Sequence, residues 1–301
     1  MRKLYFIIVT LLFSGYCYGQ QDPLYAQYLT NPMIFNPAYA GLNNAFNGSV
    51  SFRNQWSGLE GAPTTVNFSA HSSFVENKVG IGAMVINDKA GFLKNNEVEV
   101  LGSYKLNLDK YTVSFGMQFG FINSNYQYDN KILLPNPQDP AFNSGNQKYS
   151  WPNVGVGAIL KADNFIVGVS VPRMLQSKVD SSNFLVQSQH VYVYGAYVYY
   201  LNPRLRLKPS VLFRGTKGAP LSADINFNVN IDTKYSAGIF VRNFKSYGVL
   251  LQAWVFDKFR FGYAFELPTG ASIGPQFTSH ELTLAVKMAL LNSHDKSFSE
   301  F

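Results

Sequence analysis

The residues that could carry acid–base or nucleophilic chemistry are few and scattered along the chain. Four histidines are present, and His280 stands directly before Glu281, a pairing of types that can transfer protons in active sites. Adjacent residues of a β-strand point to opposite faces, so these two side chains are not expected to meet. His71 and His190 are then the only loose candidates for the histidine of a Ser/His hydrolase.

Metal, nucleotide and nucleic-acid sites are not predicted. The histidines lack the spacing of metal ligands, and no glycine motif of the phosphate-binding type is present. Glycines in runs such as PNVGVGAIL are typical of strands, where they allow curvature or close backbone approach. Basic residues are scattered, without the block that nucleic-acid binding requires. We therefore expect no cofactor and no metal.

The elements that must position these residues alternate in polarity. In YTVSFGMQFGF, residues 111–121, apolar side chains fall on one face and small or polar ones on the other. A period of two that recurs along the chain predicts strands rather than helices. About fourteen such segments lie between residues 45 and 288, among them 79–86, 97–105, 110–121, 153–160 and 190–200. With 16% aromatic and 14% charged residues, the chain is predicted to be all-β, a transmembrane antiparallel up-and-down β-barrel.

The connections between the predicted strands alternate in length. Those after even-numbered strands, such as LNLDK, KADN and FDK, are short, whereas most after odd-numbered strands, such as NQWSGLEGAP and NDKAGFLKNN, are longer. Outer-membrane barrels place short turns in the periplasm and long loops outside the cell. The stretch HVYVYGAYVYY, residues 190–200, carries tyrosines near both ends, as the aromatic girdles of such barrels do. We name the two ends of the barrel the short-turn end and the long-loop end.

The start of the chain is typical of an exported protein. Arg2 and Lys3 precede an apolar run and then small residues, which predicts a cleaved signal peptide over residues 1–19 that removes Cys17. We then expect an N-terminal periplasmic or plug segment over 20–44, an outer-membrane barrel over 45–289 and a C-terminal tail over 290–301. The N-terminal segment could either plug the lumen or form a strap packed under the barrel rim. The predicted location is the outer membrane of a Gram-negative bacterium.

Charged side chains gather on the polar face of the predicted strands, which we expect to line the lumen. Isolated charges are costly away from bulk water, so we expect these residues to pair across the lumen in a structural role. The alternative is a pore lined by basic residues that favours anions. A barrel of this size needs either a plug or a channel. The lumen candidates are Glu97, Glu99, Arg206, Lys208, Asp224, Arg260, Glu266, Glu281 and Lys287, with Arg53, Lys105, Lys161, Arg214 and Arg242 on the same face.

The first long loop is the candidate for binding a partner. Arg53, Asn54, Gln55 and Trp56 end the first strand, and Gly61 and Pro63 shape the loop that follows. Trp and Arg are enriched at the centres of protein interfaces, so Trp56 could anchor a partner protein. The alternative is that Trp56 belongs to the aromatic girdle and the glycines and proline only shape the turn.

Several strings, in order, resemble one protein family. They include QDPLYAQYLTNPMIFNPAYAG, RNQWSGLEGAPTT, NDKAGFLKNN, DPAF, PNVGVGAIL, FIVGVSVPRML, LKPSVLF, GAPLSADINFN and SHELTLAVKM. Together they are similar to the PorP/SprF family of type IX secretion and gliding-motility outer-membrane proteins. The resemblance extends from Gln21 to about Met288.

The resemblance implies a non-enzymatic 14-stranded barrel that helps to export or surface-anchor a partner. That partner would be a secreted surface protein, such as an adhesin with a C-terminal targeting domain, and/or a periplasmic component of the secretion machine. Outer-membrane lipid would surround the barrel. Two alternatives remain, a passive channel for small solutes and a lipid-modifying enzyme that uses His71 or His190.

Overall fold

The computed structural model describes residue 28 and residues 31–126, 147–175, 188–217, 219–270 and 274–295. Two short 3-10 helices come first, η1 (Pro32–Ile34) and η2 (Pro37–Tyr39). None of the helices in these ranges is long and apolar enough to cross a membrane. The predicted signal peptide, residues 1–19, and the DPAF string lie outside the described residues.

Strands make up the rest of the fold. They are β1 (Phe46–Asn54), β2 (Thr64–Phe74), β3 (Val79–Ala90), β4 (Leu93–Asn107), β5 (Thr112–Tyr126), β6 (Gln147–Lys161), β7 (Phe165–Val171), β8 (His190–Tyr197), β9 (Tyr199–Tyr200), β10 (Leu205–Thr216), β11 (Ser222–Ile231), β12 (Tyr235–Arg242), β13 (Ser246–Val255), β14 (Phe259–Pro268) and β15 (Ser279–Met288). β8 and β9 are two parts of one strand, interrupted only at Val198, and both pair with β10.

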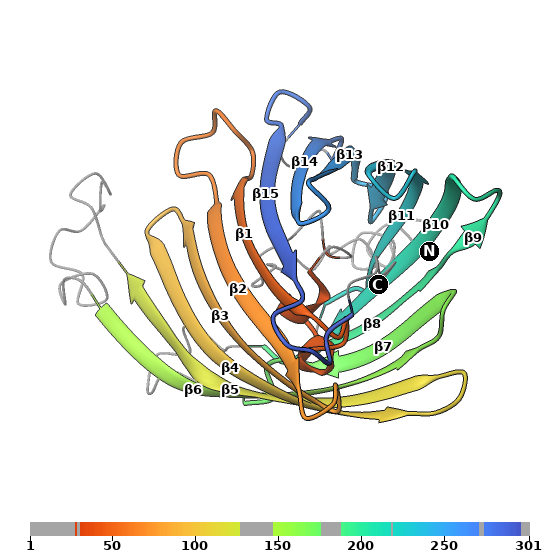
Figure 1. The fold of residues 1–301 in the computed structure, drawn as a ribbon. Coiled ribbons are helices and arrows are strands. Elements are labelled where there is room, and N and C mark those ends of the chain that lie inside the picture. The colour runs from red at the N-terminus through yellow and green to blue at the C-terminus, as the bar shows by residue number, and fades with distance from the viewer. Residues whose placement is uncertain are drawn as a thin grey trace, which may run out of the picture.

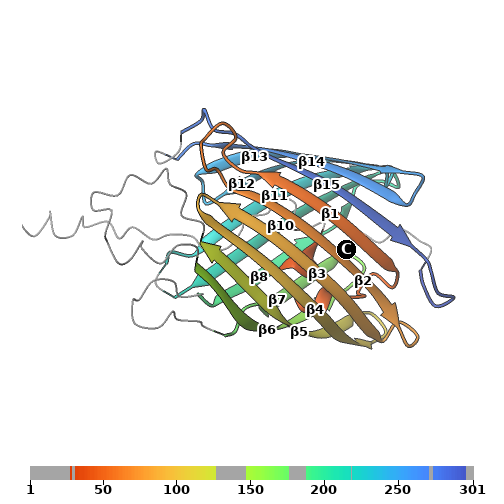
Figure 2. The same cartoon turned by 90° about the vertical axis from the view of Figure 1, so that its left-hand side faces the viewer.

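The sheet closes on itself as a barrel. Each strand pairs antiparallel with its neighbour in the chain, and β1 also pairs with β15, in a register that sets Phe46 opposite Met288 and Asn54 opposite His280. Figures 1 and 2 show the resulting ring of tilted strands. With β8 and β9 counted as one, the barrel has the 14 strands expected from the alternation. Closure gives each strand a hydrogen-bonded neighbour on both sides, as a membrane-spanning sheet requires.

The two faces of each strand differ as the alternation predicts. On β5, Met117 and Phe119 are 63% and 54% exposed on the outer face, whereas Ser114 and Gln118 are buried inside. The same division runs around the barrel, because successive side chains of a strand point to opposite faces. The outer surface is therefore an apolar band suited to lipid, and the lumen is lined by small and polar residues.

Several strands extend further toward the long-loop end than predicted. The segments expected at 79–86 and 97–105 are Val79–Ala90 and Leu93–Asn107, so most of NDKAGFLKNN is hairpin rather than loop. Polar residues continue the ladder here, with Asn87 opposite Asn96 and their side chains hydrogen-bonded. The prediction was wrong because backbone pairing does not stop where the apolar band ends. β5 and β6 are longer than expected in the same way.

Candidate functional site in the barrel lumen

Residues 31–45, which we call the inner segment, lie inside the barrel. Met33, Ala38 and Ala40 are each 0% exposed, and Figure 1 draws the segment in red within the ring of strands. Its two 3-10 helices each begin with a proline, Pro32 and Pro37. Proline suits a first helical position because the missing N–H has no partner to lose there. The short helices give the segment a compact shape that fits across the lumen.

Glycines on the inner wall make room for this segment. A Cβ atom added to Gly116 of β5 would overlap the backbone of Ala38, and one added to Gly80 of β3 would overlap the carbonyl of Ala40. Strand glycines commonly mark close approach of another backbone. Gly41 in the segment itself has a φ of +65°, a conformation that favours glycine, and it lies against Gly80.

Hydroxyl groups beside these glycines donate hydrogen bonds to the carbonyls of the segment. Ser114 Oγ donates to the Ala38 carbonyl at 2.7 Å, Ser103 Oγ to the Ala40 carbonyl at 2.7 Å and Ser170 Oγ to the Phe35 carbonyl at 2.6 Å. A short, irregular segment cannot satisfy its own backbone, so the wall must do so. These bonds fix the segment against β4, β5 and β7.

Longer side chains complete the attachment. Asn36 donates to the carbonyls of Ala158 and Val169 at 3.3 and 3.2 Å. Lys105 Nζ donates to the Gly41 carbonyl at 2.5 Å and to Asn44 Oδ1 at 2.6 Å. His71 Nδ1 accepts from the Gly41 N–H at 3.0 Å, so this histidine is a structural acceptor at the inner segment.

Aromatic packing fills the space between the segment and β8. The Phe35 ring stacks on Tyr192 with 5.7 Å between ring centroids and meets Tyr194 edge-on at 5.1 Å. Tyr197 and Tyr199 of the same sequence stretch have the opposite parity and are exposed on the outer face of the barrel. Burial raises the pKa of Tyr28 and Tyr39 above the usual phenol value, so both hydroxyls stay protonated at neutral pH.

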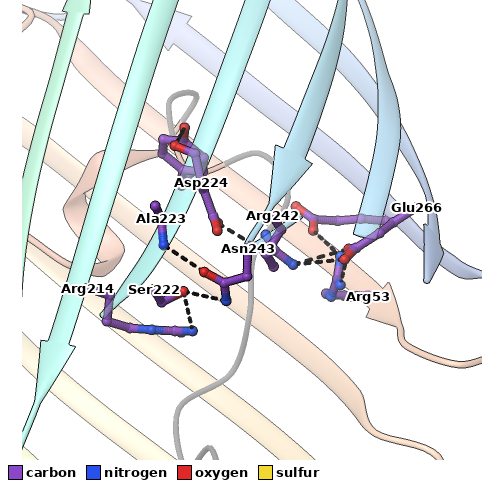
Figure 3. A network of polar contacts seen from close by, with 10 residues as sticks. Arg53, Arg214, Ser222, Ala223, Asp224, Arg242, Asn243 and Glu266 are labelled. Atoms are coloured by element: carbon purple, nitrogen blue, oxygen red, sulfur yellow. Dashed lines mark hydrogen bonds and ion pairs between the residues drawn. The ribbon is translucent and has the colours of Figure 1, made fainter. Parts of the chain in front are cut away.

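An ion-pair network crosses the long-loop half of the lumen (Figure 3). Arg53 contacts Glu266 at 2.6 Å and Glu281 at 3.2 Å, and Arg242 contacts Asp224 at 3.0 Å and Glu266 at 3.1 Å. All five side chains are at most 9% exposed. Arginine suits this role because its planar group can bridge two carboxylates at once. The network joins β1, β11, β12, β14 and β15.

A second polar group lies on the opposite wall. Arg173, just after β7, pairs with Glu97 of β4. The neighbouring Pro172 carbonyl accepts from Gln118 Nε2 and Asn153 Nδ2, each at 3.0 Å, and Asn153 also donates to Glu99 at 2.7 Å. The chain after β7 therefore turns inward and occupies lumen space that the loop lengths alone did not predict.

The basic lumen candidates occupy the other half of the barrel. Arg206 and Lys208 stand near the start of β10, Arg260 near the start of β14 and Lys287 near the end of β15. These ends meet at the short turns. Arg260 lies over the Trp254 ring at 5.3 Å and Arg206 over Tyr200 at 5.4 Å. Of the nine predicted lumen charges, the five carboxylates lie in the long-loop half and contact partners there. The four basic residues lie in the short-turn half, apart from those carboxylates.

The predicted partner-binding residues separate into two groups. Arg53 is 2% exposed and belongs to the ion-pair network rather than to a surface, because its alternation places it inward. Trp56, with a φ of 54°, begins the loop proper, and its N–H donates to Ser279 Oγ at 3.1 Å. Gly61 accepts from the Gly91 N–H of the β3–β4 turn at 2.9 Å. Asn54, Gln55, Trp56, Gly61 and Pro63 stay at the rim, partly or fully exposed.

His280 and Glu281 do not form the acid–base pair considered for the sequence, because they point to opposite faces of β15. His280 lies on the outer face, where Nδ1 contacts Tyr263 Oη at 2.8 Å and Nε2 contacts Thr278 Oγ1 at 3.1 Å, while Glu281 points inward. His190 Nδ1 contacts the Ser188 carbonyl at 3.1 Å. Among the described residues, no group of three His, Cys, Asp or Glu side chains is placed to hold a metal ion.

Two residues of the C-terminal tail, His294 and Asp295, form hydrogen bonds at the short-turn end of the barrel. No pattern in the sequence indicated these contacts. His294 Nε2 is 2.9 Å from the Ser73 carbonyl, and its Nδ1 accepts from the N–H groups of Leu290 and Leu291. Asp295 contacts Asn44 through both its backbone N–H and its side chain. The tail therefore meets the inner segment, through pairings too distant in sequence for any local pattern to reveal.

Comparisons with solved structures show the barrel fold. The outer membrane protein Omp33 of Acinetobacter baumannii has a TM-score of 0.50 at 10% identity, over 82% of this chain and 100% of that chain. The NanC porin has a TM-score of 0.41 at 10% identity, over 82% and 100% of the two chains, and the KdgM porin 0.39 at 10%, over 80% and 98%. A search of curated proteins finds no match to the chain.

A family model settles which barrel family this is. The model described as "Type IX secretion system membrane protein PorP/SprF" matches residues 18–286. That span includes the inner segment, the ion-pair network and every strand, except for the last two residues of β15. The chain is therefore a member of the PorP/SprF family of type IX secretion outer-membrane barrels.

Proposed function

We propose that this barrel binds one partner protein of the type IX secretion machinery and helps to export it or hold it at the cell surface, without catalysis. The observation that carries the proposal is a family match over residues 18–286 on a barrel whose lumen is occupied by its own chain. A protein of this kind works through its rims and loops. The partner would be a secreted surface protein, for example an adhesin with a C-terminal targeting domain, and/or a periplasmic component of the machine.

The first loop is our candidate for the contact. Its backbone is tied to two neighbouring loops through Ser57 to the Thr278 carbonyl and through Gly91 to the Gly61 carbonyl. A loop held in this way loses little conformational freedom on binding, which favours affinity. Trp56 would supply the anchor.

An open channel for small solutes is less well supported. The inner segment crosses the short-turn half, and Pro172 with Arg173 turns into the long-loop half. Both would have to move before solute could pass. We further propose that residues 1–19 are removed on export, and the mass of the mature protein tests this directly.

Affinity purification tests the function. A tagged copy is crosslinked in native outer membranes, extracted in mild detergent and analysed by mass spectrometry. We expect a large secreted protein or periplasmic components of the machine to be recovered with it. The Trp56→Ala variant should lose most of the recovery of a secreted surface protein, which would meet the long-loop end, whereas Phe74→Ala, at the other end of the barrel, should keep it. Recovery of the barrel alone after crosslinking would contradict the proposal.

A further inference from the structure

An apolar groove of about 680 Å³ lies on the outer face of the barrel, lined by residues of β1 and β11–β15. Its volume is within the roughly 300–1,000 Å³ of ordinary small-molecule sites. The side chains that border it point outward and are well exposed, with Tyr235, Leu251 and Phe261 at 58%, 52% and 51%. Phe52 and Leu282 continue the wall on β1 and β15. The groove therefore opens to the membrane and not to the lumen.

Two alanines on neighbouring strands form the floor of the groove. Ala237 of β12 and Ala253 of β13 face outward, because they share the parity of Tyr235 and Leu251. Ala253 is paired with both Tyr235 and Phe261, and Ala237 is paired with Leu251. Each small side chain thus lies beside a large one, so the large side chains stand as walls around a floor of methyl groups.

The lining of the groove suits a hydrocarbon ligand. The polar residues Ser236, Gln252 and Thr283 line it from strand positions of the opposite parity, whose side chains face the lumen. A polar solute would need donors and acceptors in the groove to fix its orientation, whereas a hydrocarbon chain needs only apolar area. Because the outer face lies against membrane lipid, the occupant that this chemistry fits is an acyl chain.

One end of the groove reaches the short-turn end of the barrel. Tyr235 is the first residue of β12, and a tyrosine hydroxyl is favoured where hydrocarbon meets headgroups. The three turns nearest to it carry more exposed cations than exposed carboxylates, namely Arg204, Lys234 and Lys258 against Asp232 and Asp257. Arg204 lies 3.7 Å from Asp232. Basic side chains at this level attract the phosphate groups of lipids.

We propose that this groove binds one acyl chain of a phospholipid from the periplasmic leaflet, with the lipid phosphate at the β11–β12 turn. The chain runs from Tyr235 toward Phe52 and Leu282, which lie further along their strands from the short-turn end. Contact with large side chains on both sides holds this lipid more tightly than a smooth apolar surface would. The site goes beyond partner binding and does not depend on it.

Native mass spectrometry of the folded barrel, released from mild detergent, tests the site. Phosphatidylglycerol is titrated in, and the occupancy of the first bound lipid is recorded. Ala253→Phe fills the floor of the groove and should lower the affinity for that lipid by about tenfold. The matched control is Ala83→Phe, which should bind as the parent chain does. Ala83 faces outward on β3, two residues from Ile81 and Val85, and is not among the described residues that line the groove.

A photoactivatable lipid locates the bound chain independently. The folded barrel is placed in vesicles that contain a phospholipid with a diazirine in one acyl chain, irradiated, digested and mapped by mass spectrometry. Labels should concentrate on β12, β13 and β14 and should be lost from these strands with Ala253→Phe. Labels spread evenly around the barrel would mean general contact with lipid and would overturn the proposal.

The remaining outcomes also decide against the proposal. Unchanged lipid affinity with Ala253→Phe, or an equal loss with Ala83→Phe, would show that the groove holds no particular lipid. Equally tight binding of diacylglycerol, which has no phosphate, would contradict the contact at the turn. A dimer that Ala253→Phe abolishes, without bound lipid, would assign the groove to a second copy of the chain. Slower-migrating folded barrels on unheated gels confirm that each variant is folded. Because only purified chain and lipid are used, failure here leaves recovery of a partner from cells untouched.

Discussion

Arg53 is one of two arginines, with Arg242, that hold the lumen network together, because each bridges two carboxylates from different strands. The contacts of Arg53 with Glu266 and Glu281 measure 2.6 and 3.2 Å, at 3% side-chain exposure. Arg53→Gln would leave Glu281 without this counter-charge and Glu266 with Arg242 alone. Removing one partner of a buried ion pair costs about 3–5 kcal/mol. We expect the free energy of unfolding, measured by urea titration in lipid vesicles, to fall by that amount.

An exposed ion pair gives the matched control. Arg204 lies 3.7 Å from Asp232, with side-chain exposures of 84% and 50%, and Arg204→Gln should cost less than about 1 kcal/mol. Neutralising a carboxylate as well, in Arg53→Gln with Glu281→Gln, should restore part of the loss. If the double variant is no more stable than Arg53→Gln alone, the cost comes from packing of the long side chain and not from its charge.

The sequence predicted which side chains face the lumen but not which of them meet. Alternation was sufficient to place Arg53, Asp224, Glu266 and Glu281 on the inner face, because a strand has only two faces. Arg53 is 213 residues from Glu266, and their contact depends on the register with which β1 closes onto β15. No local pattern encodes that register. Arg53 was therefore grouped with Trp56 as a loop residue that could bind a partner, whereas in the structure Trp56 lies at the rim and Arg53 is buried in the lumen.

At the scale of the element, the inner glycines decide where residues 31–45 can lie. Gly116→Val would place a branched side chain where the Ala38 backbone now sits, so we expect the inner segment to be displaced while the strand itself still forms. Gly102→Val is the control, since a Cβ at Gly102 meets nothing within 4 Å. The two variants add the same side chain to two strands that are neighbours in the barrel, β5 and β4.

A single introduced cysteine reports the displacement. Leu42 is 2% exposed in the inner segment, and the natural chain has one cysteine, Cys17, which can be replaced. Leu42→Cys should react slowly with a membrane-impermeant maleimide in the parent and Gly102→Val backgrounds, and at least about tenfold faster with Gly116→Val. Equal rates in all three backgrounds would show that the glycine at 116 does not determine the position of the segment.

Strand number and strand faces could be predicted because the pattern repeats fourteen times, so that errors at single residues average out. A plug of the lumen was one of two alternatives for residues 20–44, and the sequence could not choose between them, since the position of the inner segment depends on contacts across the lumen such as Asn36 with Ala158 and Val169. The glycine runs were interpreted as sites of curvature or close backbone approach, without a way to identify the approaching backbone. The lengths of β3 and β4 were underestimated because hydropathy marks the membrane band and not the end of hydrogen bonding.

At the scale of the whole molecule, the barrel is wide enough to conduct and is filled by its own chain. Fourteen strands enclose more space than wall side chains fill. The inner segment is bonded to β2, β4, β5, β6 and β7. Arg173 and the ion-pair network occupy the other half. The filled lumen agrees with the proposed function, since a barrel that acts by binding a partner protein would have no need of an open pore.

Planar-bilayer recordings test whether the inner segment closes the barrel. The parent chain should show little or no steady conductance, whereas a chain that begins at Phe46 should show long-lived open channels. Those channels should prefer anions, because Lys161, Arg260 and Lys287 then line an aqueous passage, and the reversal potential in a salt gradient gives the sign. Gly116→Val should conduct intermittently, as its segment is displaced but still present. If the parent chain conducts as well as the shortened chain, the lumen is already open. A passive channel for small solutes then becomes the better account of the function.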